Sequence, residues 1–233
     1  MRTVGLRYLL VVFLVGLSFT SAQAAPIDIR IDLSNKVGTT GGNWNNVSNF
    51  AGTTSGLIDF GTGAATTVSI NAGGGWRDFY GDESGAFPDR DWLIQPATMD
   101  GAGLDKGVTG TFALGGVTAP FYRIEIVSAR TTFDYLNYFT VDGALADRTY
   151  NGTSVNDPWG STTDGLTPGN WLIWDMVSSA GGITIQAVAS SSTLGMINAM
   201  RILEVEQVPE PATMLLLGLG LVGLAGVRRR FQN

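Results

Sequence analysis

The feature that most constrains this chain is an apolar residue at every second position in short segments. Residues 27–33 read Ile-Asp-Ile-Arg-Ile-Asp-Leu, so the aliphatic side chains would line one face of a strand while the charged side chains face water. No long segment of the body repeats apolar residues at helical spacing. The pattern predicts strands.

Further segments have strand character and are separated by clusters of Gly, Asn, Asp and Pro. They are residues 57–60, 66–70, 108–114, 121–127, 138–141, 171–177, 183–189 and 197–205. Short strands divided by turn residues favour an antiparallel sandwich or barrel over a parallel sheet with crossover helices. We therefore predict an all-β fold, with an antiparallel β-sandwich as the body of the chain, residues 26–207.

The chain contains no cysteine and no histidine. The body therefore has no disulfide and must be held together by its core. Ser-His-Asp and Cys-His catalysis and the usual zinc sites are excluded as well. A glycosidase needs only two carboxylates, but no spacing singles out a pair, so we name no catalytic residue and expect no enzymatic activity.

The first residues combine Arg2 and Arg7 with an apolar run over residues 8–19 and the small residues Ala22-Gln23-Ala24. Basic, apolar and small-residue regions in this order predict a secretory signal peptide over residues 1–24. The alternative is an N-terminal membrane anchor. The apolar run is shorter than the roughly 20 residues that a spanning helix needs, which favours the signal peptide.

The other end of the chain, residues 208–233, has three parts. Pro209-Glu210-Pro211 precedes an apolar segment over residues 214–227, and Arg228, Arg229 and Arg230 follow it. The apolar segment would enter a membrane as a helix, with the arginines on the cytoplasmic side.

The order of these three parts resembles the PEP-CTERM sorting signal of Gram-negative bacteria. The resemblance implies that an exosortase cuts near Pro209-Glu210-Pro211 after a transient stay in the inner membrane, and that the body reaches the cell surface or the exterior. It also implies a setting of exopolysaccharide and biofilm. An ordinary permanent tail anchor is the alternative.

A second resemblance covers residues 108–205. The Gly181-Gly182 turn, the strand Ile183-Thr184-Ile185 and the closing segment over residues 197–202 resemble galactose-binding-like and malectin-like jelly rolls. The resemblance implies a jelly-roll sandwich for the body. It leaves function open, because one fold can host many functions.

Without its two ends, the body keeps 9 basic against 19 acidic residues, a net charge of −10. An acidic body would repel nucleic acid, whose binding depends on Lys and Arg contacts to phosphates. Cations, neutral glycans or basic partners suit it better.

Glycan-binding sandwiches stack sugars on exposed aromatic rings and orient hydroxyl groups with charged or amide side chains. Loops of this composition supply the candidate ligand-binding residues Trp76, Arg77, Asp78, Tyr80, Trp92 and Trp159. The alternative is that the rings are buried under long loops. Trp171 and Trp174 fall on opposite faces of one predicted strand, so we expect one to be buried and the other to be exposed or at an edge.

Calcium is a candidate structural ion, because galactose-binding-like domains often hold one and Ca²⁺ prefers oxygen ligands. The nearest cluster of carboxylates is Asp82, Glu83, Asp89 and Asp91. Solvated surface carboxylates are the alternative.

The sequence favours an exported, non-enzymatic protein that binds polysaccharide or contributes to an extracellular matrix. The alternatives are a structural or adhesive surface protein with no defined ligand, and a glycan-processing enzyme. Exposed tryptophans on one face would favour binding, whereas fully buried tryptophans would favour the structural role.

Overall fold

The computed structural model describes residues 25–33, 40–79, 92, 97, 101–128, 137–150, 171–191 and 194–205. This part of the chain forms strands, turns and connecting segments, with no α-helix. The expected signal peptide, residues 1–24, and the expected tail helix, residues 214–227, lie outside the described residues.

The strands follow one another along the chain with short connections between many of them. They are β1 (Asp28–Asp32), β2 (Asn45–Asn46), β3 (Thr53–Thr54), β4 (Ser69–Gly74), β5 (Arg77–Phe79), β6 (Gly101–Leu104), β7 (Thr109–Gly115), β8 (Phe121–Val127), β9 (Asn137–Val141), β10 (Arg148–Tyr150), β11 (Trp171–Ser178), β12 (Ile183–Ala189), β13 (Gly195–Ile197) and β14 (Ala199–Glu204).

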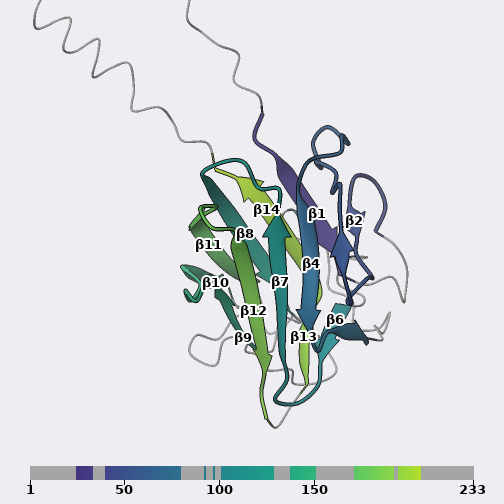
Figure 1. Cartoon of the computed structure of the whole chain (residues 1–233), viewed down its shortest axis with the longest axis vertical. Helices are drawn as coiled ribbons and strands as arrows, with labels where there is room; N and C mark the ends of the chain where they lie inside the picture. Colours follow the sequence, from purple (N-terminus) through teal and green to yellow (C-terminus); the bar gives the residue numbers. More distant parts are fainter. Residues whose placement is uncertain are drawn as a thin grey trace, which may run out of the picture.

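Two of the three sheets face each other as the layers of a sandwich (Figure 1). The six-stranded sheet has the order β10-β11-β8-β14-β1-β2, and the five-stranded sheet has the order β3-β4-β7-β12-β9. A smaller sheet, β13-β6-β5, completes the set. All pairs are antiparallel except the short β1–β2 pair. The predicted all-β, antiparallel architecture is confirmed.

The main core lies between the two large sheets and is built from alternate residues. Ile183, Ile185 and Ala187 of β12 belong to this core, as do Ile124 and Ile126 of β8. Each fully buried large aliphatic side chain contributes about 1.5–3 kcal/mol relative to an exposed one. Burial of this kind stabilises the sandwich without disulfides.

A second core lies on the outer face of the six-stranded sheet. It contains Val127 and Ile173 from the sheet and the rings of Trp44 and Trp92. The expectation that the charged residues of β1 face water is wrong for this reason. The side chain of Asp28 is only 15% exposed, and Asp32 is completely buried.

Several predicted strands match the structure, and three differ from it. β4, Ser69–Gly74, shares only residues 69 and 70 with the predicted strand over residues 66–70. β8 and β12 have the predicted bounds. Residues 57–60, in contrast, form only an isolated bridge, between Ile58 and Ala65.

The predicted strand over residues 197–205 is interrupted at Asn198. The backbone N–H of Asn198 donates to the carbonyl of Val127, while its own carbonyl accepts from the Leu33 N–H. β13 ends just before this residue and β14 begins just after it. At this point the chain passes from the small sheet into the six-stranded sheet.

We predict that Gly116→Ala destabilises the body, residues 26–207, far more than Gly107→Ala. Both glycines have a positive φ, +67° and +70°, which alone costs roughly 1–2 kcal/mol for an L side chain. A Cβ at Gly116 would lie 1.9 Å from the carbonyl oxygen of Thr67, whereas a Cβ at Gly107 meets nothing within 4 Å. Urea unfolding of both variants measures the difference, and equal losses would contradict the prediction.

Candidate functional site

The residue at the centre of the outer face is Glu125, in the middle of β8. Its neighbours across the sheet are Ile173 of β11 and Arg201 of β14, and Arg201 in turn lies opposite Arg30 of β1. Glu125 is only 1% exposed. A buried carboxylate destabilises the fold unless it is paired and hydrogen-bonded. The contacts of Glu125 therefore show whether the carboxylate has a structural role.

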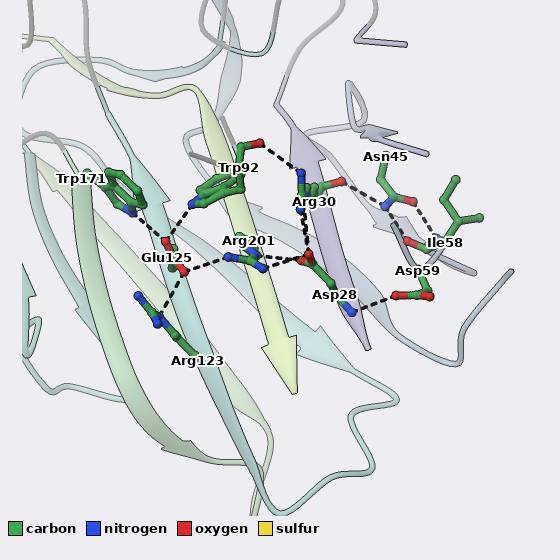
Figure 2. A network of polar contacts seen from close by, with 10 residues as sticks. All are labelled: Asp28, Arg30, Asn45, Ile58, Asp59, Trp92, Arg123, Glu125, Trp171 and Arg201. Atoms are coloured by element: carbon green, nitrogen blue, oxygen red, sulfur yellow. Dashed lines mark hydrogen bonds and ion pairs between the residues drawn. The ribbon is translucent and has the colours of Figure 1, made fainter. Parts of the chain in front are cut away.

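Both oxygens of Glu125 meet donors (Figure 2). Oε2 accepts from the indole N–H groups of Trp92 and Trp171, each at 2.8 Å. Oε1 lies 3.1 Å from Nε of Arg123 and 3.4 Å from Nη1 of Arg201. The carboxylate is therefore bound on both sides by groups from three strands and one loop residue.

Asp28 extends this network to β1. Its Oδ1 and Oδ2 accept from Nε and Nη2 of Arg201 at 2.8 and 3.0 Å. Arg30 also donates to Oδ2, from Nη2 at 3.1 Å. The Arg30 guanidinium lies 3.5 Å above the centre of the Phe60 ring, and its Nη1 donates to the carbonyl of Trp92 at 3.3 Å. Figure 2 shows that these charged groups and the central carboxylate form one continuous network.

Three tryptophan rings cover the network. Trp44 and Trp92 are stacked, with ring centroids 5.8 Å apart, and Trp92 meets Trp171 edge to face at 6.2 Å. All three are buried and pack with Val127 and Ile173. The indole N–H groups of Trp92 and Trp171 donate hydrogen bonds to the Glu125 carboxylate, while the rings exclude water from it.

Asn45 attaches the segment between β1 and β4 to the same sheet. Its side-chain amide donates to the carbonyls of Arg30 and Ile58, at 3.1 and 3.0 Å. The amide oxygen accepts from the Ile58 N–H at 2.7 Å. One side chain thus replaces the backbone hydrogen bonds that a longer strand would form at this edge.

Asp59 fixes the start of β1. Its Oδ1 accepts the backbone N–H of Asp28 at 2.9 Å, and its Oδ2 accepts from the Thr62 hydroxyl at 2.6 Å. Burial acts to raise the pKa of Asp59, but the hydrogen bonds from Thr62 and Asp28 outweigh it and hold the pKa below its ordinary value.

The candidate ligand-binding residue Trp76 is buried in the main core. It is 6% exposed, its ring stacks on Phe112 with centroids 4.7 Å apart, and its indole N–H donates to the carbonyl of Thr111 at 3.1 Å. This placement favours the alternative in which the ring is a core residue. Trp92 is also buried, but in the outer core, so the structure does not bring these two rings together.

The remaining candidate ligand residues are scattered. Arg77 is exposed and forms an ion pair with Asp105. Asp78 follows it within β5. Tyr80 and Trp159 lie outside the described residues. No shared platform of these residues is seen in the part of the chain that the structure describes.

Trp171 and Trp174 lie on opposite faces of the six-stranded sheet, as predicted, but both are buried. Trp174 enters the main core, and Trp171 enters the outer core. The expectation that one of them is exposed or at an edge is wrong, because β10 lies beyond β11 in the sheet and the outer face is covered by other parts of the chain.

The proposed calcium ligands Asp82, Glu83, Asp89 and Asp91 all lie outside the described residues. Among the residues that the structure does describe, no group of three or more acidic side chains could hold a metal ion. The metal site therefore remains a prediction from the sequence.

Sequence reasoning missed Glu125, Arg201 and Asp28 as a connected group. Glu125 stands in the segment Arg-Ile-Glu-Ile-Val and Arg201 stands in Met-Arg-Ile-Leu. Charged residues that alternate with apolar ones are typical of a strand with one face in water, so the local pattern carried no signal that these charges are buried. The partner of each charge follows only from the strand order.

Comparison with known proteins identifies one segment of the chain. The PEP-CTERM protein-sorting motif matches residues 207–230. No curated protein and no solved structure matches the chain, so the jelly-roll resemblance has no relative to support it. In the part that the structure describes, no helix is long and apolar enough to cross a membrane.

We predict that Glu125→Gln destabilises the body by about 3 kcal/mol or more, as expected when one partner of a buried ion pair is removed. The amide NH₂ would face either the two indole N–H groups or the two guanidinium groups, so donors would meet donors. Denaturant unfolding and near-UV circular dichroism measure the loss.

Glu204→Gln is the control for this substitution. The Glu204 carboxylate lies at the end of β14 and accepts only the Ile27 N–H in the described contacts. Its replacement should change stability much less. A Glu125→Gln variant as stable as the control would contradict the interpretation of the network.

We also predict a pH-dependent contribution from Asp59. Since its pKa is lowered in the folded state, its stabilising effect is present above the ordinary value of 3.8 and is lost as the pH falls through the folded value. The gap in unfolding free energy between the wild type and Asp59→Asn should be largest near neutral pH and should shrink in acid. Urea unfolding at several pH values measures the gap. A gap that stays constant or widens in acid would show that the carboxylate charge is not responsible.

Proposed function

From the premise that this is an exported protein sorted by an exosortase through its PEP-CTERM motif, we propose that its body is a non-enzymatic structural component of the cell surface or extracellular matrix. The observation that carries the proposal is the use of the tryptophans. All those that the structure describes are buried: Trp44, Trp76, Trp92, Trp171 and Trp174. A loop platform for sugars would need exposed rings.

The acidic residues of the outer face support the non-enzymatic part of the proposal. A glycan-processing enzyme needs two carboxylates that face each other across a cleft, one to donate a proton and one to attack or to activate water. Glu125 and Asp28 instead place their oxygens on arginine and tryptophan donors. Carboxylates engaged in this way suit a stabilising role.

The position of the ends supports delivery of an intact body. The end of β14 pairs with the start of β1, with Leu203 opposite Asp28. The match to the sorting motif begins at residue 207, shortly after β14 ends at Glu204. Every described strand of the sandwich therefore precedes the motif, and cutting near Pro209-Glu210-Pro211 would remove none of them.

The test is a deletion strain that is complemented in three ways. Wild-type protein should restore the cohesion of the surface matrix and should be recovered outside the cells with its tail removed. A variant with Pro209, Glu210 and Pro211 replaced by alanine should keep its full C-terminal mass, stay in the membrane fraction and fail to restore cohesion.

The third complementing protein, Glu206→Ala, is the matched control. It changes a residue just before the matched motif, residues 207–230, and leaves the motif intact, so it should behave as the wild type. Cohesion that is unchanged in the deletion strain would overturn the structural role. Release of soluble sugars from the matrix by the purified protein would favour the enzyme instead.

A further inference from the structure

The two large sheets differ in where their charges lie. Strands β3, β4, β7, β9 and β12 of the five-stranded sheet contain no Asp, Glu, Lys or Arg. In the six-stranded sheet, by contrast, β1, β8, β10, β11 and β14 all contain charged residues. A five-stranded sheet whose strands contain no charged residue is unusual in a body whose net charge is −10. It indicates a surface with a use other than solubility.

The outward side chains of this sheet form aligned rows. Thr111 lies opposite Gln186, Thr109 lies opposite Val188, and Val188 lies opposite Tyr138. Most of these side chains are exposed, and Tyr138 is 41% exposed. We call this surface the neutral face and define it by Asn71, Thr109, Thr111, Tyr138, Thr184 and Gln186.

The chemistry of the neutral face selects its partner. Its hydroxyl and amide groups both donate and accept hydrogen bonds, as sugar hydroxyls do. The five strands themselves carry no charged side chain, and in the described part of the chain the carboxylate of Asp142, just after β9, borders the face, with its Oδ1 accepting the Thr184 N–H. A charged partner lying along the strands would therefore lose hydration without gaining an ion pair there. The exposed ring of Tyr138 beside Val188 supplies an apolar surface for the C–H groups of a sugar.

The size of the neutral face favours a polymer chain over a second copy of the protein as its partner. Five strands spaced about 4.8 Å apart, the longer ones spanning about six residues at 3.3 Å per residue, give a face of roughly 500 Å² at most. A stable protein interface of standard size buries about 800 Å² on each partner and has an apolar centre. The face is smaller and more polar than that, whereas a polysaccharide chain needs only a strip of it.

We propose that the neutral face of the five-stranded sheet binds a neutral polysaccharide chain, with Tyr138 as the stacking residue and Gln186 and Thr109 as hydrogen-bonding residues. The site uses exposed side chains of the sheet itself, whereas the candidate ring of Trp76 is buried beneath it, with its indole N–H on the carbonyl of Thr111. The inference goes beyond the proposed structural function, which needs no glycan site. A protein that supports the matrix without binding glycan would overturn this inference alone.

The test uses the processed protein recovered from outside the cells and affinity electrophoresis in gels that contain one polysaccharide each. Dextran, galactomannan and hydroxyethyl cellulose are the neutral probes, and alginate is the acidic probe. We expect retardation by at least one neutral probe and none by alginate. Tyr138→Ala should weaken that retardation by about tenfold, the effect of losing one good ring contact, and Gln186→Ala should weaken it to a smaller extent.

Met176→Ala is the matched control, because Met176 is a large exposed side chain on β11 of the other sheet, 55% exposed. It should bind as the wild type, and thermal unfolding should show that all three variants are folded. Retardation by no neutral probe, by alginate alone, or to the same extent in Tyr138→Ala and the wild type would overturn the proposal. Sedimentation that shows a dimer lost in Tyr138→Ala would assign the face to a second copy instead.

Discussion

Burial of the Glu125 carboxylate is the constraint on which the outer half of the structure depends. A charge in this position is tolerated only if donors reach both of its oxygens. The donors come from Trp92, Trp171 and Arg201, and Arg123 adds an ion pair. Satisfying one carboxylate therefore joins β8 to β11 and β14 and brings a distant loop residue onto the sheet. Through Arg201 the same requirement reaches β1.

This arrangement gives the two faces of the sandwich different roles. On the six-stranded sheet, Glu125 and Asp28 are paired with arginines, and tryptophan rings cover the Glu125 carboxylate, so that these charges stabilise the fold. On the five-stranded sheet, the outward side chains of the strands are uncharged, and several of them are exposed. The paired charges of the first face help to stabilise a protein that has no disulfides.

Local patterns predicted a large part of the fold. The alternation in residues 121–127 and 183–189 was sufficient to predict β8 and β12, because one face of each strand packs into the main core. For β1 the same alternation led to a wrong prediction. Its charged residues were expected to face water, but the second face of the six-stranded sheet is covered by other parts of the chain. The site was less predictable, since the loop aromatic residues Trp76 and Trp92 are buried in two different cores.

The sequence by itself determined that the body is built from strands, that it has no disulfides and no imidazole chemistry, and that it carries the sorting motif at residues 207–230. Each of these depends on residue type or on neighbours along the chain. Only the tertiary structure decided which charges are paired and which faces are covered. Glu125 is separated from Trp171 by 46 residues and from Arg201 by 76, and such contacts are set by the order of strands in a sheet, which short-range periodicity does not encode.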